Sequence, residues 1–289
     1  MRRFASSVVA ATLIVSMLEG GIPAGATGGG TVSYLAIGTS LTVGYQPSGQ
    51  TSNGFVDDLL RTVQAQIPEL SLRNVGCPGE TSASMITGKH SACHYAAGSQ
   101  LDAAVAFLQA HPGQVAFITL EVGANDLVDR CLNPNTGRIG RACAADLLPR
   151  LQTRLTQIVD AVRTAAGPDV PIVAMTYYDP FLGVWGLIPE GRAVARADQR
   201  VWTTLNDMFT TTYASAGVTL ADIATTFRID DFTDTLVVPG RGELPTNVAL
   251  ICRWTWFCSA KFFADPHANR TGYRKIADTI DAALEPLLP

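Results

Sequence analysis

Five residues whose types together support nucleophilic catalysis stand at separate points of the chain. They are Ser40 in "GTSLTVGY", Gly79 in "NVGCPGETS", Asn125 in "EVGANDL", and the pair Asp265 and His267 in "FFADPHANRTGY". A serine hydroxyl is a poor nucleophile until a base removes its proton, and histidine has a suitable pKa near neutrality. Each residue alone has an ordinary interpretation as a cap, a turn or a solvated loop residue, so the prediction of acyl-transfer chemistry depends on the set.

The elements that must position these residues alternate along the chain. Five apolar runs separated by segments of helical periodicity imply a flavodoxin-like three-layer α/β/α sandwich around a central five-stranded parallel sheet. Reacting groups in such sheets gather beyond the carboxyl ends of the strands, where Ser40, Gly79 and Asn125 fall. We expect strands at 32–39, 70–76, 113–123, 170–179 and 218–223, and helices at 54–67, 100–111, 144–167, 191–217 and 272–288.

In order and position, these blocks resemble those of the SGNH (GDSL) hydrolase family of esterases and lipases over nearly the whole mature chain. The four marker residues of that family match Ser40, Gly79, Asn125 and His267. The resemblance implies the SGNH hydrolase fold and an acyl-enzyme on Ser40, with His267 as general base. It also implies an oxyanion hole made by the backbone N–H groups of Ser40 and Gly79 and the side-chain amide of Asn125. No cofactor is expected.

Two departures from the family pattern stand out. Thr39 replaces the aspartate of the Gly-Asp-Ser-Leu motif, so charge is missing beside the nucleophile. The family usually spaces its acid and base as Asp-x-x-His, whereas one residue separates Asp265 from His267 here, and position 264 is Ala. Either Asp265 reaches His267 through an altered turn and completes the catalytic set, which we expect, or a backbone carbonyl orients the histidine. The G-x-S-x-G elbow of α/β-hydrolases does not fit this serine.

The beginning of the chain has the character of a secretory signal. Two arginines open it, a mostly apolar run extends to Leu18, and small residues at Ala24 and Ala26 resemble a cleavage site. We therefore expect a signal peptide over residues 1–26, cleaved near Ala26, followed by one hydrolase domain over 27–289 and secretion from the cell. An uncleaved membrane anchor is the alternative, but the apolar run is short and broken.

Composition excludes some classes of protein and predicts disulfides. The 289 residues are 47% hydrophobic with a formal net charge of −4, which suits a packed domain and not a nucleic-acid surface. We expect a monomer without a stable membrane anchor. The metal interpretation is weak because no C-x-x-C occurs and the four histidines do not fall at ligand spacing with the cysteines. Several disulfide connectivities are possible, and we favour the sequence-local pairs Cys77 with Cys93, Cys131 with Cys143, and Cys252 with Cys258.

The substrate is less well specified than the reaction. Three segments break the alternation of strands and helices: a polar loop at 129–146, an apolar loop at 180–191 and a long irregular stretch at 227–264. Their aromatic and apolar residues suit the acyl chain of a lipid or simple carboxylic ester, or they pack the loops onto the sheet. Deacetylation of a polysaccharide, acyl transfer to an alcohol, and a non-catalytic secreted binding module are the other hypotheses.

Overall fold

The computed structural model describes residues 32–262 and 264–288, so the signal peptide predicted at 1–26 lies outside the described residues. One five-stranded sheet, parallel throughout, has the strand order β2-β1-β3-β6-β7. This is a doubly wound order whose switch point lies between β1 and β3. The predicted central parallel sheet is confirmed. Its strands are β1 (Val32–Ile37), β2 (Leu70–Asn74), β3 (Val115–Leu120), β6 (Ile172–Met175) and β7 (Thr219–Ala221).

The central strands are buried because their sequences are almost continuously apolar, which is typical of strands covered on both faces. The register between β1 and β3 pairs Ile37 with Leu120, so both strands end at the same level. The backbone N–H of Glu121 still donates to the carbonyl of Ile37, at 3.0 Å. The segments that carry Ser40 and Asn125 therefore leave the sheet side by side at the switch point.

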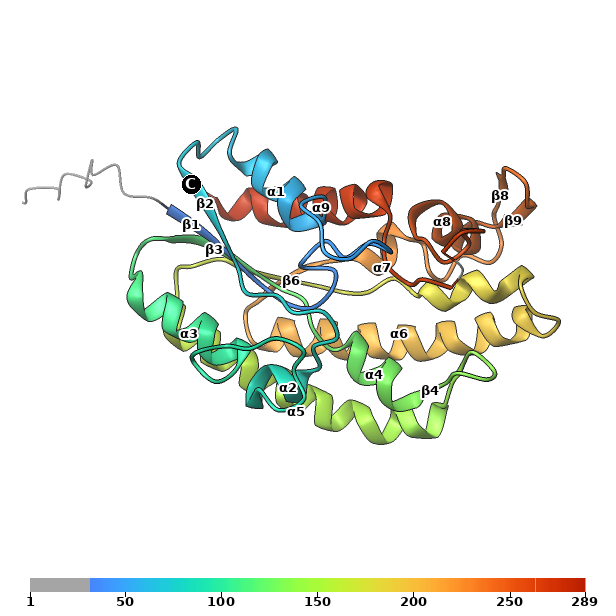
Figure 1. The fold of residues 1–289 in the computed structure, drawn as a ribbon, viewed down its shortest axis with the longest axis horizontal. Coiled ribbons are helices and arrows are strands. Elements are labelled where there is room, and N and C mark those ends of the chain that lie inside the picture. Colours follow the sequence, from blue (N-terminus) through green and yellow to red (C-terminus); the bar gives the residue numbers. More distant parts are fainter. Residues whose placement is uncertain (1–31, 263, 289) are drawn as a thin grey trace, which may run out of the picture. The chain divides into compact units, whose positions relative to one another are not determined.

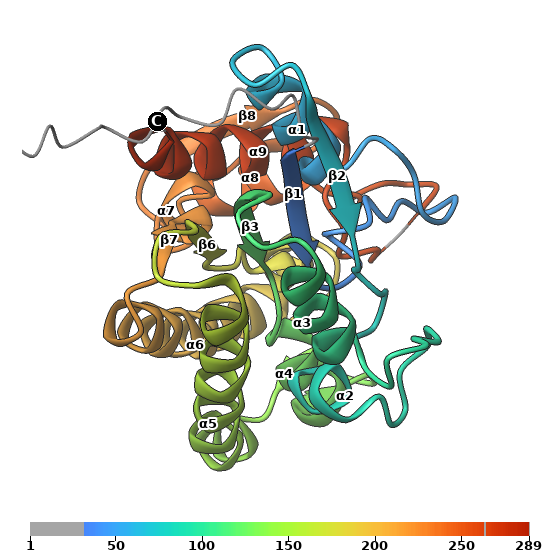
Figure 2. The same ribbon diagram turned by 90° about the vertical axis from the view of Figure 1, so that its left-hand side faces the viewer.

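Helices cover both faces of the sheet (Figures 1 and 2). One layer contains α1 (Phe55–Val63) and α9 (Arg270–Leu284), which pack against each other. The other contains α3 (Gln100–Ala110), α5 (Arg141–Ala166) and α6 (Gly191–Ser215). Each helix turns a stripe of apolar residues toward the common core. The expected three-layer sandwich is thus the architecture observed.

The stretch at 227–264, expected to be irregular, contains more regular structure than its composition suggests. It holds a hairpin of β8 (Thr235–Val238) and β9 (Gly242–Pro245), followed by helix α8 (Thr246–Trp254). The expectation was wrong here because the helix is short and buried along most of its length, so its residues lack a clear periodic pattern. The Pro-Gly-Arg-Gly sequence at 239–242, which links β8 to the start of β9, is a hairpin signal that was not used in the prediction.

Short elements fill the remaining loops. Among the helices that were not expected, α2 (Ser82–Thr87) and α4 (Ala124–Cys131) lie at the carboxyl edge of the sheet. The others are the ribbon of β4 (Leu132–Asn133) and β5 (Arg138–Ile139), the helix α7 (Ile223–Thr226), and the 3-10 helices η1 (Pro180–Gly186) and η2 (Glu285–Leu287). Across residues 32–262 and 264–288, none of the helices combines the length and apolar character that crossing a bilayer requires.

The six cysteines form three disulfides, and these are the three sequence-local pairs. Cys77–Cys93 lies in the loops around α2, while Cys131–Cys143 joins the end of α4 to the first turn of α5. Cys252–Cys258 joins α8 to the segment that follows it. All three bonds fall in segments that surround the carboxyl edge of the sheet.

Candidate active site

Ser40 lies in a turn that begins directly after β1 and is tightly constrained. The side-chain amide of Gln100 accepts a hydrogen bond from the N–H of Gly38 (2.8 Å) and donates one to its carbonyl (3.0 Å). A Cβ at Gly38 would lie 2.1 Å from Oγ1 of Thr42 and 2.7 Å from the carbonyl oxygen of Glu121. Only glycine permits this close approach. The half-buried Ser40 follows at the point where the turn faces outward.

Glu121 lies beneath this turn and was missed by sequence reasoning. Its carboxyl group accepts hydrogen bonds from the backbone N–H of Thr39 (2.8 Å) and the hydroxyls of Thr39 (2.9 Å), Thr42 (3.1 Å) and Tyr177 (2.6 Å). The residue is only 2% exposed, and burial raises its pKa above the ordinary range. An acidic group therefore does stand beside the nucleophile turn, although Thr39 itself is uncharged. The signal was a single glutamate at the end of an otherwise apolar run.

Hydrogen bonds connect the segment that carries Gly79 to the segment that carries Asn125 and to the nucleophile turn. The Asn125 amide nitrogen donates to the carbonyl of Glu80, at 2.9 Å, and the N–H of Cys77 donates to the carbonyl of Gly38, at 3.0 Å. Gly79 has a φ of +75°, which disfavours any residue with a side chain, and a Cβ there would meet nothing within 4 Å. Backbone conformation, and not lack of space, requires glycine at this position.

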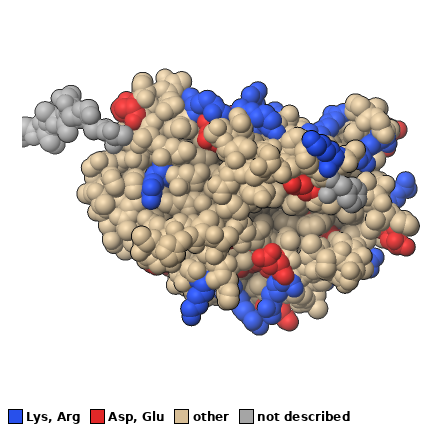
Figure 3. Space-filling model, in the orientation of Figure 1, with Lys and Arg blue, Asp and Glu red and all other residues tan. Residues whose placement is uncertain are grey.

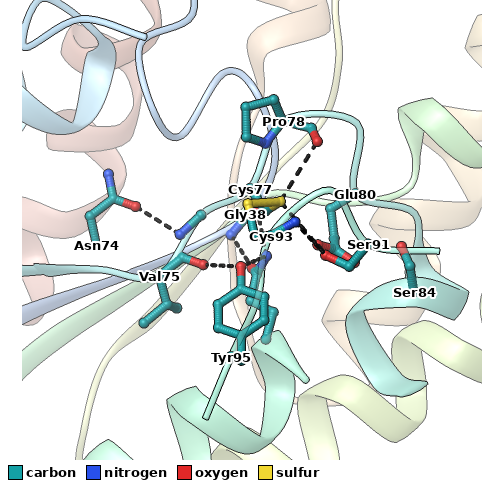
Figure 4. The surroundings of a disulfide bond; sticks show 12 residues. Gly38, Asn74, Val75, Cys77, Pro78, Glu80, Ser84, Ser91, Cys93 and Tyr95 are labelled. Atoms are coloured by element: carbon teal, nitrogen blue, oxygen red, sulfur yellow. Dashed lines mark hydrogen bonds between the residues drawn. A yellow bond between two sulfur atoms is a disulfide. The ribbon is translucent and has the colours of Figure 1, made fainter. Parts of the chain in front are cut away.

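The Cys77–Cys93 disulfide joins the segment that leads to Gly79 to the segment that follows α2 (Figure 4). The hydroxyl of Ser91 donates to the Glu80 side chain, at 2.8 Å, and that of Tyr95 donates to the carbonyl of Val75, at 2.8 Å. These contacts fix the chain on both sides of Gly79.

Asp265 and His267 form a hydrogen-bonded pair despite their short spacing. Oδ1 of Asp265 lies 2.7 Å from Nδ1 of His267 and also accepts from the backbone N–H of His267, at 2.9 Å. Ala264, which directly precedes Asp265, has a φ of +61°, so the chain enters the pair through a residue in the left-handed conformation. The group that contacts Nδ1 of the imidazole is therefore the Asp265 carboxylate and not a backbone carbonyl. Because an ionised carboxylate only accepts, Nδ1 carries hydrogen and Nε2 remains the basic atom.

The environment of this pair favours an ionised aspartate. Burial alone would raise the pKa of Asp265, but hydrogen bonds from the imidazole and the backbone N–H of His267 outweigh it and hold that pKa below its ordinary value. Two tyrosines support the segment: the ring of Tyr45 lies 4.8 Å from the imidazole between centroids, and the hydroxyl of Tyr178 donates to the carbonyl of Pro266, at 2.9 Å.

One pocket, of about 90 Å³, brings Ser40, Asn125 and His267 together. Gly79 is outside its lining, and Asp265 stands behind the imidazole. Figure 3 shows a hollow on this side of the molecule, surrounded mostly by uncharged residues. Among the described residues no hydrogen bond joins the Ser40 hydroxyl to His267, and such contacts often tighten only when substrate binds. Nor do the described residues include a group of three or more histidine, cysteine or acidic side chains arranged to hold a metal ion.

Comparison with known proteins places this chain in a family. The family model of the GDSL-like lipase/acylhydrolase family matches residues 36–275. None of the curated proteins matches the chain. Similar solved structures include an extracellular lipase from Streptomyces rimosus, with 16% identity, a TM-score of 0.54, and coverage of 87% of this chain and 99% of that one. A lipase/acylhydrolase from Enterococcus faecalis has 16% identity, a TM-score of 0.50, and coverage of 89% and 97%. These likenesses show the shared fold. The family match covers most of the sequence, so the chain belongs to the GDSL-like lipase/acylhydrolase family and is an ester hydrolase.

Proposed function

We propose that the protein is a secreted serine esterase that hydrolyses carboxylic esters through an acyl-enzyme on Ser40. The observation that carries the proposal is the convergence of Ser40, Asn125 and His267 on one pocket, with Asp265 hydrogen-bonded to the imidazole. A nucleophile, a base and an orienting carboxylate at one site are the arrangement that nucleophilic acyl transfer needs.

In the first half of the reaction, Nε2 of His267 accepts the proton of the Ser40 hydroxyl as Oγ attacks the ester carbonyl. Asp265 holds Nδ1–H and stabilises the imidazolium that forms. The backbone N–H groups of Ser40 and Gly79 and the amide of Asn125 donate to the oxyanion of the tetrahedral intermediate. Collapse breaks the bond to the alcohol oxygen, which takes the proton from His267. Water then attacks the acyl-enzyme by the same route and releases the acid and the serine.

Secretion and the boundary of the mature domain complete the proposal. The signal at 1–26 would deliver residues 27–289 to an oxidising compartment. Three disulfides suit such a compartment, since thiols are kept reduced in the cytosol. N-terminal sequencing of the protein recovered from culture medium tests this part, and a sequence starting upstream of Ala26 would contradict it.

Substitution of the nucleophile and the base tests the mechanism. Ser40→Ala and His267→Ala should each lower kcat for p-nitrophenyl acetate by at least about 10³-fold, because the two side chains act as a unit. A fluorophosphonate should label the wild-type chain at Ser40 and leave the Ser40→Ala variant unlabelled. Full activity in either variant would exclude the mechanism. An unlabelled wild-type protein without esterase activity would favour a binding module instead.

Asp265→Asn tests the third member separately. Loss of the carboxylate should reduce kcat by about 10²–10⁴-fold while leaving the fold intact, because the imidazole loses its orientation and its counter-charge. A decrease of less than about threefold would remove Asp265 from the catalytic set and leave the roles of Ser40 and His267 standing.

A further inference from the structure

We infer that the pocket beside Ser40 binds the acyl group of the substrate and admits only short chains, of about four carbons or fewer. The inference rests on the proposed function and specifies its substrate: esters of short carboxylic acids, such as acetate and butyrate. Two properties of the pocket lead to it, namely its volume and the rigidity of its wall, together with the order in which the two halves of the ester leave the site.

The first property is volume. The cavity measures about 90 Å³, whereas an apolar protein cavity of about 150 Å³ accommodates benzene, with its six carbon atoms. By proportion, the space here takes about four carbon atoms. Apolar surface is contributed to its lining by Ala124, Val128, Pro180, Phe181 and Trp202. A short hydrocarbon chain fits both the size and the character of this space.

The second property is a wall that does not easily move. Phe181 is 8% exposed and lies between two other rings, with its centroid 6.4 Å from that of Trp202 and 5.9 Å from that of Phe257. Its backbone N–H donates to Oδ1 of the buried Asp179, at 2.9 Å. Trp202 is 2% exposed, so a longer chain would have to displace a packed aromatic side chain.

The chemistry of the reaction indicates which half of the ester occupies the pocket. The acyl group stays attached to Ser40, which lines the pocket, until water releases it, whereas the alcohol leaves after the first half of the reaction. An apolar pocket beside the nucleophile therefore suits the acyl chain.

Most of the apolar residues of the loop at 180–191, which in the sequence suited an acyl chain, lie outside the pocket. In the segment at 180–191, Leu182 and Val184 are buried against the core and do not line the pocket. Trp185 stacks on Phe232, at 5.4 Å between centroids. Only Pro180 and Phe181 of this segment reach the cavity. The loop thus limits the acyl site and does not extend it.

The experiment measures kcat/KM for p-nitrophenyl esters from acetate to palmitate. We expect acetate and butyrate to be the best substrates and octanoate to be at least tenfold poorer. Phe181→Ala should raise the octanoate-to-butyrate ratio of kcat/KM at least tenfold, and Phe181→Leu, which keeps more of the packing, should raise it less. Val184→Ala is the matched control, because Val184 lies in the same 3-10 helix and is also 8% exposed but does not line the pocket.

The outcomes separate this inference from the proposed function. A wild-type enzyme that is labelled at Ser40 but prefers octanoate overturns the short-chain inference alone. A folded Phe181→Leu variant that keeps the wild-type octanoate-to-butyrate ratio also overturns it. So does a Val184→Ala variant that shifts this ratio as much as Phe181→Ala does. In a second series, butyrate esters of ethanol and hexanol should respond equally to Phe181→Leu, and a change confined to the alcohol preference overturns the acyl assignment. Absence of hydrolysis and of labelling would instead reject the proposed function.

Discussion

At the scale of single residues, Glu121 provides the sharpest test of how the nucleophile turn is held. Glu121→Gln places an amide N–H₂ among four donors that now share one carboxyl group. We expect the free energy of unfolding to fall by about 2 kcal/mol, because hydrogen bonds to a buried acceptor are lost. Displacement of Ser40 should lower kcat by about 10–10²-fold with little change in KM. Urea unfolding and kcat per fluorophosphonate-labelled site measure the two effects.

Tyr177→Phe is the control for this substitution, since it removes one donor and keeps the carboxyl group. Tyr177→Phe should therefore lower both the free energy of unfolding and kcat per labelled site by less than Glu121→Gln does. Glu121→Gln with an unchanged kcat per labelled site would make the residue a purely structural one and contradict its role in positioning Ser40.

The same residue shows what sequence reasoning could and could not find at this scale. Ser40, Asn125 and His267 were predicted because each lies within a recognisable block of sequence, and the structure brings them to one pocket. Glu121 was missed because residues within strand runs are expected to be core, and its partners come from Thr39, Thr42 and Tyr177, which are remote in sequence. Only the folded sheet reveals that these side chains meet.

At the scale of elements, each disulfide lies on a segment that carries a candidate site residue. Cys77 is two positions from Gly79, Cys131 ends the helix that begins beside Asn125, and Cys258 lies nine positions before His267. Cross-links in small loops restrict the unfolded chain and also limit movement in the folded one. The disulfides therefore connect stability to the geometry of the site.

Removing the Cys77–Cys93 bond should affect catalysis more than removing Cys131–Cys143. The double variant Cys77→Ser with Cys93→Ser should lose about 2–4 kcal/mol of unfolding free energy and also lose kcat, because the Gly79 loop is released. The double variant Cys131→Ser with Cys143→Ser should lose similar stability but less kcat. Its helix α4 stays attached, since Ser82 donates to the Asp126 carboxyl from its N–H (2.7 Å) and its hydroxyl (2.6 Å). Equal losses of kcat would contradict this assignment.

Element prediction succeeded where one pattern dominated. The long helices and central strands have clear periodicity or continuous apolar character, and they were placed within a few residues of their observed bounds. The helices α2 and α4 were missed because each is short and begins inside a polar turn. Tertiary contacts stabilise them, such as the bonds from Ser82 to Asp126, and these are not visible in a local sequence window.

At the scale of the whole molecule, buried carboxyl groups couple the fold to pH. Burial raises the pKa of Glu121, Asp126, Asp179 and Asp198, and brings that of Asp198 to about 6. Repulsion from the Asp198 carboxylate raises the pKa of Asp179 further. A folded state that holds protons more tightly than the unfolded chain is most stable at low pH, and loses that contribution as pH rises through the raised pKa values. Asp265 acts in the opposite direction because its pKa is lowered.

The free energy of unfolding should therefore decrease as the pH rises from about 4 to above 6, the window set by the ordinary aspartate pKa and the raised value of Asp198. Asp198→Asn keeps an acceptor for the N–H of Ile139 but cannot ionise, so it should remove about 1–3 kcal/mol of this decrease and make the protein more stable than wild type at pH 8. Urea unfolding from pH 4.5 to 8 measures the slope. Asp160→Asn, at an exposed position on α5, controls for the change in net charge. If Asp198→Asn and Asp160→Asn both kept the wild-type slope, the proton held at Asp198 would have no part in the stability of the fold.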